Sequence, residues 1–167
     1  NKNGGTKASS TDDYFKEPYG VGFDLHEIVV PDHSPLIDRN VLAVERTYKV
    51  RIVSSCEGKA VPVWPHRDTT IQAKQTLGVI ATPDAIAALN EAAKTTSRTD
   101  LDTFTDLLSA AKAGIAEVVI PPSSTLIGKS AVELWMRKSY GLAILAIHRG
   151  GETITEGVRE IPLQAGD

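Results

Sequence analysis

Short apolar runs separated by polar turns divide the chain into candidate β-strands. Each run is shorter than a typical helix and is rich in Val, Ile and Leu, which favours strands. Proline follows the first run in each half of the chain, and Gly58 and Gly150 mark hairpin turns. The predicted strands are 27–30, 50–53, a hairpin strand running toward Thr70, 77–81, 117–120, 142–147 and a hairpin strand running toward Ile161.

Helix start signals follow the first predicted strand of each half. Asn40 stands at an N-cap position, and Ser130 with Glu133 has the spacing of a capping box. Helices are therefore predicted after Asn40 and from Ser130 to just before Ser139. The apolar face of the second helix is formed by Ala131, Leu134 and Trp135.

Two further helices are predicted in the middle of the chain. Thr82 followed by Pro83 indicates a helix that runs into Asn90 or Ala93, because proline lacks an N–H that the first turn leaves unbonded anyway. A later stripe at helical spacing predicts a connecting helix, with Leu101, Phe104, Leu107, Leu108 and Ala111 on its apolar face.

The sequence also repeats itself. At an offset of 90 residues, the eleven pairs from Glu27/Glu117 to Ile37/Ile127 include six identities. At an offset of 92 the match resumes with Tyr48/Tyr140, Ile52/Ile144, Gly58/Gly150, Arg67/Arg159, Gln72/Gln164 and Ala73/Ala165. One short insertion in the second copy, in its first helix or the turn after it, explains the change of offset.

The repeat predicts an α+β fold made of two tandem β-α-β-β-β-α units. Asp167 aligns with Gln75, so the second copy is expected to be truncated before its last strand and helix. Units of about 70 residues are marginally stable alone, which predicts that the copies pair within or between chains. The predicted parts are a flexible tail or linker (1–22), the first domain (23–94), a linker and connecting helix (95–114) and the incomplete second domain (115–167).

Composition narrows the class of protein. With 41% hydrophobic and 23% charged residues, and no apolar run near the ~20 residues that span a bilayer, the chain as given is expected to be soluble. A formal charge of −3 makes nucleic acid an unexpected partner. The single cysteine, Cys56, excludes an internal disulfide and fits a reducing compartment. Residues 1–10 are polar and glycine-rich, unlike a signal peptide.

Three motifs in order resemble the C-terminal domain of the TrkA and RCK (regulator of potassium conductance) family. In the second copy they are 117–130, 140–151 and 163–167, and the first copy resembles the same domain through 27–37 and 72–83. Together the two copies cover nearly everything from Leu25 onward.

The resemblance implies a cytoplasmic domain that senses a small molecule or ion and transmits its state to a membrane protein. Domains of this family pair across a two-fold axis and bind ligand in the cleft between partners, and cyclic di-AMP is one such ligand. Tandem copies look like the loops inserted in some permeases, including divalent-anion/sodium symporters and aspartate-alanine exchangers. Binding of NAD or ATP by a Rossmann domain is not implied, because no GxGxxG motif follows a strand.

The predicted function is thus regulatory and non-enzymatic: a ligand-sensing domain pair of a membrane ion or anion transporter, at the cytoplasmic face of the membrane. The implied partners are the transmembrane part of the transporter and a second copy, as a homodimer or a pseudo-dimer. The implied ligand is a cyclic dinucleotide, another nucleotide or a small anion, with no resident cofactor. The alternative is a structural dimerisation domain that binds nothing small.

The loop after the first predicted strand of each copy is the candidate ligand site. Hydroxyl groups, a flexible glycine and a cation stand there ahead of a helix N-terminus, which favours an anion. The alternative is that the serines only cap the helix. The candidate residues are Ser123, Ser124, Thr125, Ile127, Lys129, His148 and Arg149 in the second copy, and His33, Ser34, Ile37 and Arg39 in the first. Asp38 stands where the second copy has Gly128, which adds negative charge.

The sequence gives less support to metal binding, nucleophilic catalysis or base stacking. The four histidines, His26, His33, His66 and His148, include no pair at the i, i+4 spacing of a helical zinc site, and structural roles are predicted for them. Cys56 lies in an apolar strand and is predicted to be a core residue. No GxSxG or Cys/His signature for nucleophilic catalysis is present. Trp64 and Trp135 are able to stack on a base, although packing is the more usual role of a helical tryptophan.

Overall fold

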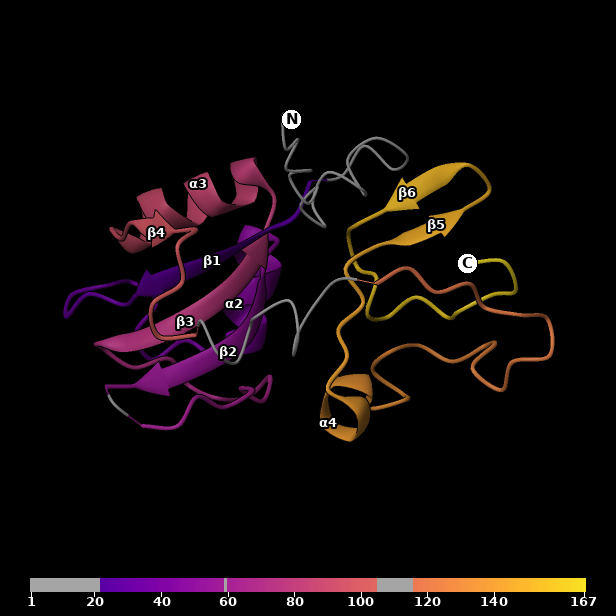
Figure 1. Cartoon of the computed structure of the whole chain (residues 1–167), viewed down its shortest axis with the longest axis horizontal. Coiled ribbons are helices and arrows are strands. Elements are labelled where there is room, and N and C mark those ends of the chain that lie inside the picture. Colours follow the sequence, from indigo (N-terminus) through magenta and orange to yellow (C-terminus); the bar gives the residue numbers. More distant parts are fainter. Residues whose placement is uncertain (1–21, 59, 105–115) are drawn as a thin grey trace, which may run out of the picture.

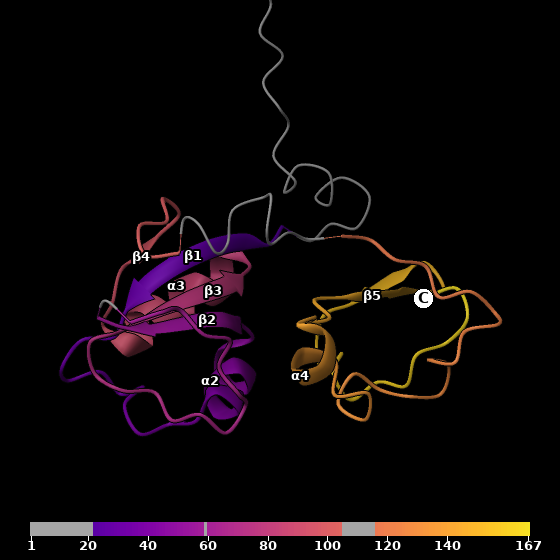
Figure 2. The same cartoon turned by 60° about the horizontal axis from the view of Figure 1, so that its bottom comes forward.

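The computed structural model describes residues 22–58, 60–104 and 116–167. These residues form two units that lie side by side in both views, an N-terminal unit (22–104) and a C-terminal unit (116–167) (Figures 1 and 2). The N-terminal unit contains β1 (Asp24–Val29), α2 (Val41–Tyr48), β2 (Arg51–Glu57), β3 (Gln75–Ala81), α3 (Pro83–Ala93) and β4 (Ser97–Arg98). The C-terminal unit contains α4 (Met136–Tyr140), β5 (Ile147–Arg149) and β6 (Glu152–Ile154).

The N-terminal unit is built on one antiparallel sheet with the strand order β2-β3-β1-β4. β3 pairs along its whole length with β1, from Thr76 opposite Val29 to Ala81 opposite Asp24, and pairs with β2 on its other side. Because β3 is central, both rows of its backbone groups are bonded, and six of its seven residues are buried. This strand holds the sheet together, since β1 and β2 do not pair with each other.

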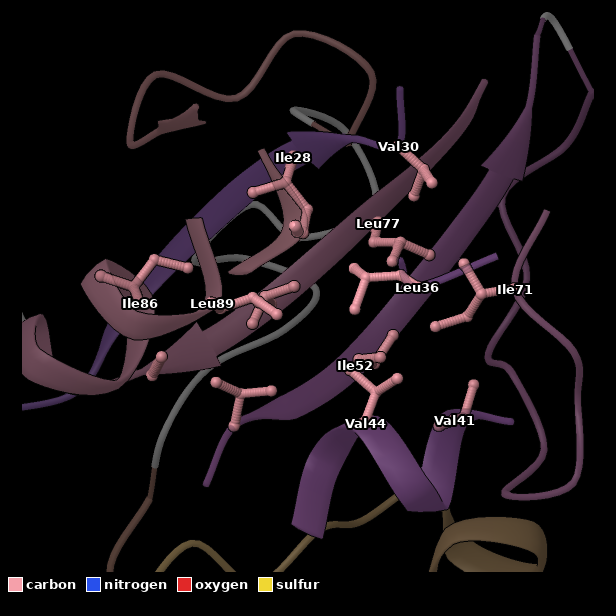
Figure 3. Packing of buried hydrophobic residues seen from close by; sticks show 14 residues of the cluster. Ile28, Val30, Leu36, Val41, Val44, Ile52, Ile71, Leu77, Ile86 and Leu89 are labelled. Atoms are coloured by element: carbon pink, nitrogen blue, oxygen red, sulfur yellow. The ribbon is translucent and has the colours of Figure 1, made fainter. Parts of the chain in front are cut away.

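Both helices of the N-terminal unit cover the same face of the sheet. Figure 3 shows Val44 of α2 and Leu89 of α3 directed at strand residues such as Ile28 and Leu77. A smaller cluster covers the opposite face, where Phe104 is completely buried. The sheet is therefore enclosed between the helices and the segment that follows β4. The main cluster comprises Ile28, Val30, Leu36, Val41, Val44, Val50, Ile52, Ile71, Leu77, Val79, Ala81, Ile86, Leu89 and Ala93.

The predicted helix starts of the N-terminal unit are confirmed. The side chain of Asn40 accepts a hydrogen bond from the backbone N–H of Ala43 at 2.8 Å, which caps α2. Thr82 caps α3 in the same way at 3.4 Å, with Pro83 in the first turn. Such caps depend only on neighbouring residues, which is why the sequence alone identifies them.

Several predicted strands are wrong. Between Gly58 and Thr70 the structure has only isolated bridges, Ser55 with Val63 and Asn40 with Thr70, so the hairpin strand predicted there is absent from the described residues. β4 lies where the sequence predicts a linker. Consequently the N-terminal unit has the order β-α-β-β-α-β instead of the predicted β-α-β-β-β-α.

The C-terminal unit differs more from its prediction. Residues 117–120 form no strand, and of the run 142–147 only Ile147 belongs to one. In the N-terminal unit the corresponding segments are held by β3, whereas no strand lies between the two segments among the described residues of the C-terminal unit. Without a central strand the two segments have no ladder partner. The predicted turn at Gly150 and Gly151 is present and joins β5 to β6.

The helix predicted from Ser130 is also shorter than expected. The capping box forms, because Glu133 accepts from the backbone N–H of Ser130 at 2.8 Å and Ser130 accepts from that of Glu133 at 3.3 Å. Residues 131–135 nevertheless form turns, and α4 begins only at Met136. Trp135 has a positive φ of 51°, which interrupts the helical backbone. Of the predicted connecting helix, residues 105–111 lie outside the described residues, and 101–104 form a bend and a turn.

Left-handed backbone conformations recur at corresponding positions in the two units. A positive φ strains most side chains and suits glycine, and glycine holds the position in all four cases in the C-terminal unit. The φ angles are 65° and 81° at Asp38/Gly128, 56° and 64° at Lys49/Gly141, 57° and 61° at Gly58/Gly150, and 61° and 87° at Lys74/Gly166. The two units therefore share their turns even where their strands differ.

Within the described residues, the structure contains no helix with both the length and the apolar character needed to cross a membrane.

His26 on β1 is buried, and neither of its ring nitrogens has a hydrogen-bond partner among the described residues. Burial lowers the pKa of His26, and the nearby carboxylate of Asp24 opposes the shift. The unfolded chain therefore binds a proton more readily than the folded chain does.

We predict that the free energy of unfolding decreases as the pH falls below about 6.5, where unfolded histidine becomes protonated. Urea denaturation on both sides of that pH measures the effect. His26→Gln reduces the acid-induced loss, and His33→Gln, at an exposed histidine, leaves it as in the wild type. An unchanged loss in His26→Gln would contradict the assignment.

Candidate functional site

The two units meet through ion pairs centred on Glu45. This residue lies on the buried face of α2 together with Val41 and Val44, and its side chain is 0% exposed. Two arginines of the C-terminal unit, Arg137 on α4 and Arg159 after β6, reach the same carboxylate. The interface thus has a charged centre that both units build.

Both carboxylate oxygens of Glu45 accept hydrogen bonds from specific donors. One carboxylate oxygen accepts from Arg137 Nη2 at 2.8 Å and from the backbone N–H of Ile52 at 2.9 Å. The other oxygen accepts from Arg159 Nη1 at 3.0 Å. A buried carboxylate is tolerated only when its charge and its hydrogen bonds are satisfied, so the burial of Glu45 depends on docking of the C-terminal unit.

Positive charge exceeds negative charge at this centre. Arg51 lies beside Glu45, and burial lowers the pKa of Arg51 although Glu45 raises it. The pKa of Arg159 is lowered by burial and raised by Glu45 in the same way. Arg51 Nε and Arg137 Nη1 are buried and have no hydrogen-bond partner among the described residues. Glu45 therefore pairs directly with two guanidinium groups and lies near a third, the carboxylate of Glu160 adds to the negative charge, and two buried donor atoms have no partner among the described residues.

Two exposed ion pairs flank the buried centre. Arg46 donates to Glu160 at 2.6 Å, and Lys49 donates to Glu156. All four side chains are about half exposed or more, so each pair contributes little to stability.

A cavity of about 670 Å³ lies between the units beside the arginines. Its wall contains five basic side chains and one acidic side chain, Asp68, which already pairs with His66 at 3.3 Å. Two tryptophans also line it: Trp64 is 44% exposed, and Trp135 is 59% exposed with Lys138 Nζ 5.4 Å from its ring centre. The basic residues are Arg51, Arg67, Arg137, Lys138 and Arg159. This wall offers charge and hydrogen bonds for an anion and flat apolar surfaces for a planar group.

A second cavity of about 480 Å³ is also lined by Arg51 and Arg159. It has four basic and four acidic residues, and the pairs of Arg46 with Glu160 and Lys49 with Glu156 belong to its wall. Its charges are balanced within the protein, so it has no surplus to offer an anion.

The sequence-predicted residues of the first loop are engaged in local contacts. Ser34 is buried, donates to the backbone carbonyl of Ala93 at 3.0 Å and accepts from the N–H of Leu36. Arg39 donates to Thr47 at 2.8 Å, and its guanidinium lies over the Tyr48 ring. His33 is exposed, and Ile37 packs against the core.

The corresponding residues of the second loop are more exposed. Ser124 accepts from the N–H of Leu126 at 3.2 Å. Ser123, Thr125 and Lys129 are exposed, and Ile127 is 38% exposed. His148 lies 3.1 Å from the hydroxyl of Thr153.

Arg149 forms a bidentate pair with Asp167, at 2.7 and 2.6 Å, and also donates to the carbonyl of Pro162. This pairing lowers the pKa of Asp167. Asp38 and Gly128 share a left-handed backbone, so the aspartate preserves the turn while it changes the charge.

Sequence reasoning missed the charged centre. None of the predicted loop residues lines either inter-unit cavity, whereas Trp64 and Trp135, singled out for stacking, both line the larger one. One signal was available: the offset of 92 that aligns Arg67 with Arg159 also aligns Glu45 with Arg137. Opposite charges at corresponding helix positions of two paired copies indicate a contact between them.

The chain thus consists of an antiparallel sheet with two helices on one face and a second unit, with two cavities where the units meet. The chain belongs to the TrkA-C domain family, whose model matches residues 25–94 and residues 115–167. The family resemblance predicted from the sequence is confirmed.

A transporter sequence and a solved structure are each similar to part of this chain. The chain is 39% identical over 54 residues to "Uncharacterized transporter YfbS" of Escherichia coli (strain K12), a match that spans 32% of this chain and 9% of that protein. A solved structure described as the GsuK RCK domain matches 68% of this chain and 29% of its own, at 13% identity and a TM-score of 0.37, a likeness too weak to define a shared fold.

The centre at Glu45 leads to a prediction about stability. Glu45→Gln leaves Arg137 and Arg159 largely buried without a counter-charge, and we expect a loss of about 3 kcal/mol in the free energy of unfolding. Chemical denaturation followed by tryptophan fluorescence measures it. The matched control is Glu160→Gln, in the exposed pair with Arg46, with an expected loss below about 1 kcal/mol. Equal losses in the two variants would show that Glu45 is not the centre of the interface.

Proposed function

We propose that the chain is a ligand-sensing regulatory part of a membrane transporter, built from two copies of one TrkA-C domain. Three observations support this proposal: the family model matches twice, left-handed turns recur at corresponding positions, and a relative carries the name of a transporter. The proposed place is the cytoplasmic face of the membrane, and the proposed partner is the transmembrane part of the transporter. The role is non-catalytic.

The contacts between the units support the proposal that the two copies pair about a pseudo-two-fold axis. Glu45 and Arg137 occupy corresponding positions and touch, as residues near a two-fold axis do. The pair of Arg46 with Glu160 in the smaller cavity corresponds by the offset of 92 to Lys138 and Asp68, which both line the larger cavity. The two cavities are thus related by the pseudo-symmetry.

The related cavities nevertheless differ in chemistry. Where Lys49 pairs with Glu156 in the smaller cavity, the larger one has Gly141 and Trp64 at the corresponding positions. The charges in the wall of the smaller cavity are balanced by its own ion pairs. The larger cavity has two tryptophans in its wall and arginines with unused donors. We therefore expect one ligand per chain.

The observation that carries the proposal is the pair of buried, unused donors, Arg51 Nε and Arg137 Nη1. Buried donors without partners cost free energy, and both arginines line the larger cavity, so a shift of either side chain toward the cavity lets an acceptor there recover that cost. The ligand proposed is a small anion, and a nucleotide fits best because Trp64 and Trp135 offer stacking surfaces beside the charge.

Binding at this place has a route to regulation. An anion that binds Arg137 through Nη1 shares the guanidinium group that Glu45 holds through Nη2, and Arg137 and Glu45 belong to different units. Ligand binding therefore changes the contacts that set how the units pack, which is the differential interaction that a conformational signal requires. A transmembrane partner attached to the units would receive that signal.

A binding screen tests this proposal. We expect phosphate, sulfate, dicarboxylates and nucleotides, compared at equal ionic strength, to include at least one anion that raises the melting temperature saturably with one site per chain in calorimetry. Arg51→Met weakens that binding about tenfold, as expected for loss of one charge-assisted hydrogen bond. Arg98→Met, at an exposed position on β4, controls for net charge.

The same screen separates the remaining possibilities. Lys129→Met and Arg39→Met leave the affinity unchanged if the cavity is the site, and weaken it if the predicted loops bind the ligand. If no anion stabilises the protein, the chain is instead a structural pairing domain without a small ligand.

A further inference from the structure

The six residues from Ala60 to Pro65 form an apolar loop on the surface of the N-terminal unit. Their sequence is Ala-Val-Pro-Val-Trp-Pro, without a charged side chain. The side chains of Val61, Val63 and Trp64 are 82%, 55% and 44% exposed. An exposed run of consecutive apolar residues is unfavourable in water and marks a contact surface.

The fold does not require apolar residues at these positions. By the offset of 92, the loop corresponds to 152–157, with the sequence Glu-Thr-Ile-Thr-Glu-Gly. Threonine stands there in place of Val61 and of Val63, and Glu156 stands in place of Trp64. A glycine with a positive φ precedes both segments, so the two units make the same turn with opposite side-chain character. The apolar side chains of the first unit therefore serve its surface and not its turn.

The backbone of the loop is fixed to the edge of the sheet. Val63 and Ser55 exchange two backbone hydrogen bonds, at 2.8 and 2.9 Å, and Ala60 donates to the carbonyl of Glu57 at 3.0 Å. Figure 1 shows the segment that follows β2 running along the outer edge of this strand. Because the backbone is already ordered, a partner that covers the valines loses little free energy to ordering the loop.

Basic side chains lie beside the loop. Trp64 belongs to the wall of the larger cavity, together with Arg67, Trp135 and Lys138. Arg67 and Lys138 are exposed, and the ammonium group of Lys138 lies over the Trp135 ring. Asp68, the acidic residue of this wall, already pairs with a neighbouring histidine. The surface thus combines exposed valines and tryptophans with an excess of positive charge.

This combination fits an anionic lipid bilayer better than it fits a protein partner at the membrane. Tryptophan is enriched at the boundary between membrane and water, and each Lys or Arg near anionic headgroups adds attraction. The cytoplasmic loops of membrane proteins carry an excess of Lys and Arg, so a basic surface repels them. A second copy of the chain that used the same surface would bring like charges together.

We propose that the loop from Ala60 to Pro65, with the adjoining Arg67 and Lys138, is a docking surface for an anionic lipid bilayer. The proposal rests on the proposed place of the chain at the cytoplasmic face of the membrane. It does not rest on an anion in the larger cavity, because Val61 and Val63 line neither of the two cavities. Trp64 belongs both to the loop and to the cavity wall, so docking places the proposed ligand site next to the bilayer.

Sedimentation of the full chain with lipid vesicles tests the proposal. We expect the chain to sediment with vesicles of phosphatidylglycerol and phosphatidylcholine, and to stay in solution with phosphatidylcholine alone. Tryptophan emission shifts to shorter wavelength in the bound state, because Trp64 leaves water. Val61→Thr combined with Val63→Thr, which copies the residues of the second unit, weakens binding at least tenfold. The matched control is Val118→Thr with Val119→Thr, at valines that are 73% and 65% exposed, and it binds as the wild type does.

Two further measurements separate this surface from the proposed anion site. Arg67→Met weakens vesicle binding about fivefold at low salt, and the difference shrinks at high salt. Binding of inorganic phosphate, followed by calorimetry, is the same in the wild type and in the variant with threonine at both loop valines.

The outcomes that overturn the proposal are distinct from those that overturn the anion site. Absence of binding to anionic vesicles, or equal binding by the wild type and the loop variant, overturns the docking surface even if the cavity binds phosphate. Self-association that the loop variant abolishes, without vesicle binding, assigns the loop to a second copy and overturns the proposal as well. Vesicle binding by a chain that binds no anion in solution supports the docking surface and contradicts the proposed anion site alone.

Discussion

The carboxylate of Glu45 is the point on which the arrangement of the two units depends. It is fully buried, and its counter-charges come from Arg137 and Arg159 of the other unit. Neither the carboxylate nor the arginines can be buried alone without a large desolvation cost, so the interface forms as a whole. Surface pairs such as Arg46 with Glu160 orient the units but add little energy.

The same centre joins stability to the proposed sensing role. The cluster joins the two units through Glu45, and in the proposed role its two unused donors attract a further anion. The two cavities differ in their walls: ion pairs balance the charges of one, whereas Trp64 and an excess of basic residues line the other. A sensor needs such an imbalance, since a ligand acts only through states that it stabilises unequally.

The central strand is the second constraint on this fold. β3 pairs with both β1 and β2, which do not pair with each other, and the sheet that it holds together is covered on both faces. In the C-terminal unit, Val118 and Val119 have the same β-forming character as Ile28 and Val29, yet they form no strand and stay exposed. Strand formation is therefore a property of the pair of segments and not of the segment itself.

The sequence by itself determined the local features, which are the caps at Asn40 and Thr82, the turn at Gly150 and the core position of Cys56, and it also determined the family. These depend on neighbouring residues or on periodicity, which a sequence displays directly. Tertiary structure decided which predicted strands exist and where the charged centre lies. Glu45 and Arg159 are far apart in sequence, and nothing local distinguishes a helix glutamate that faces solvent from one buried against two arginines. Only the packing of one unit on the other distinguishes the two cases. A glutamate that is buried by this packing needs counter-charges from the other unit, and a glutamate in solvent does not.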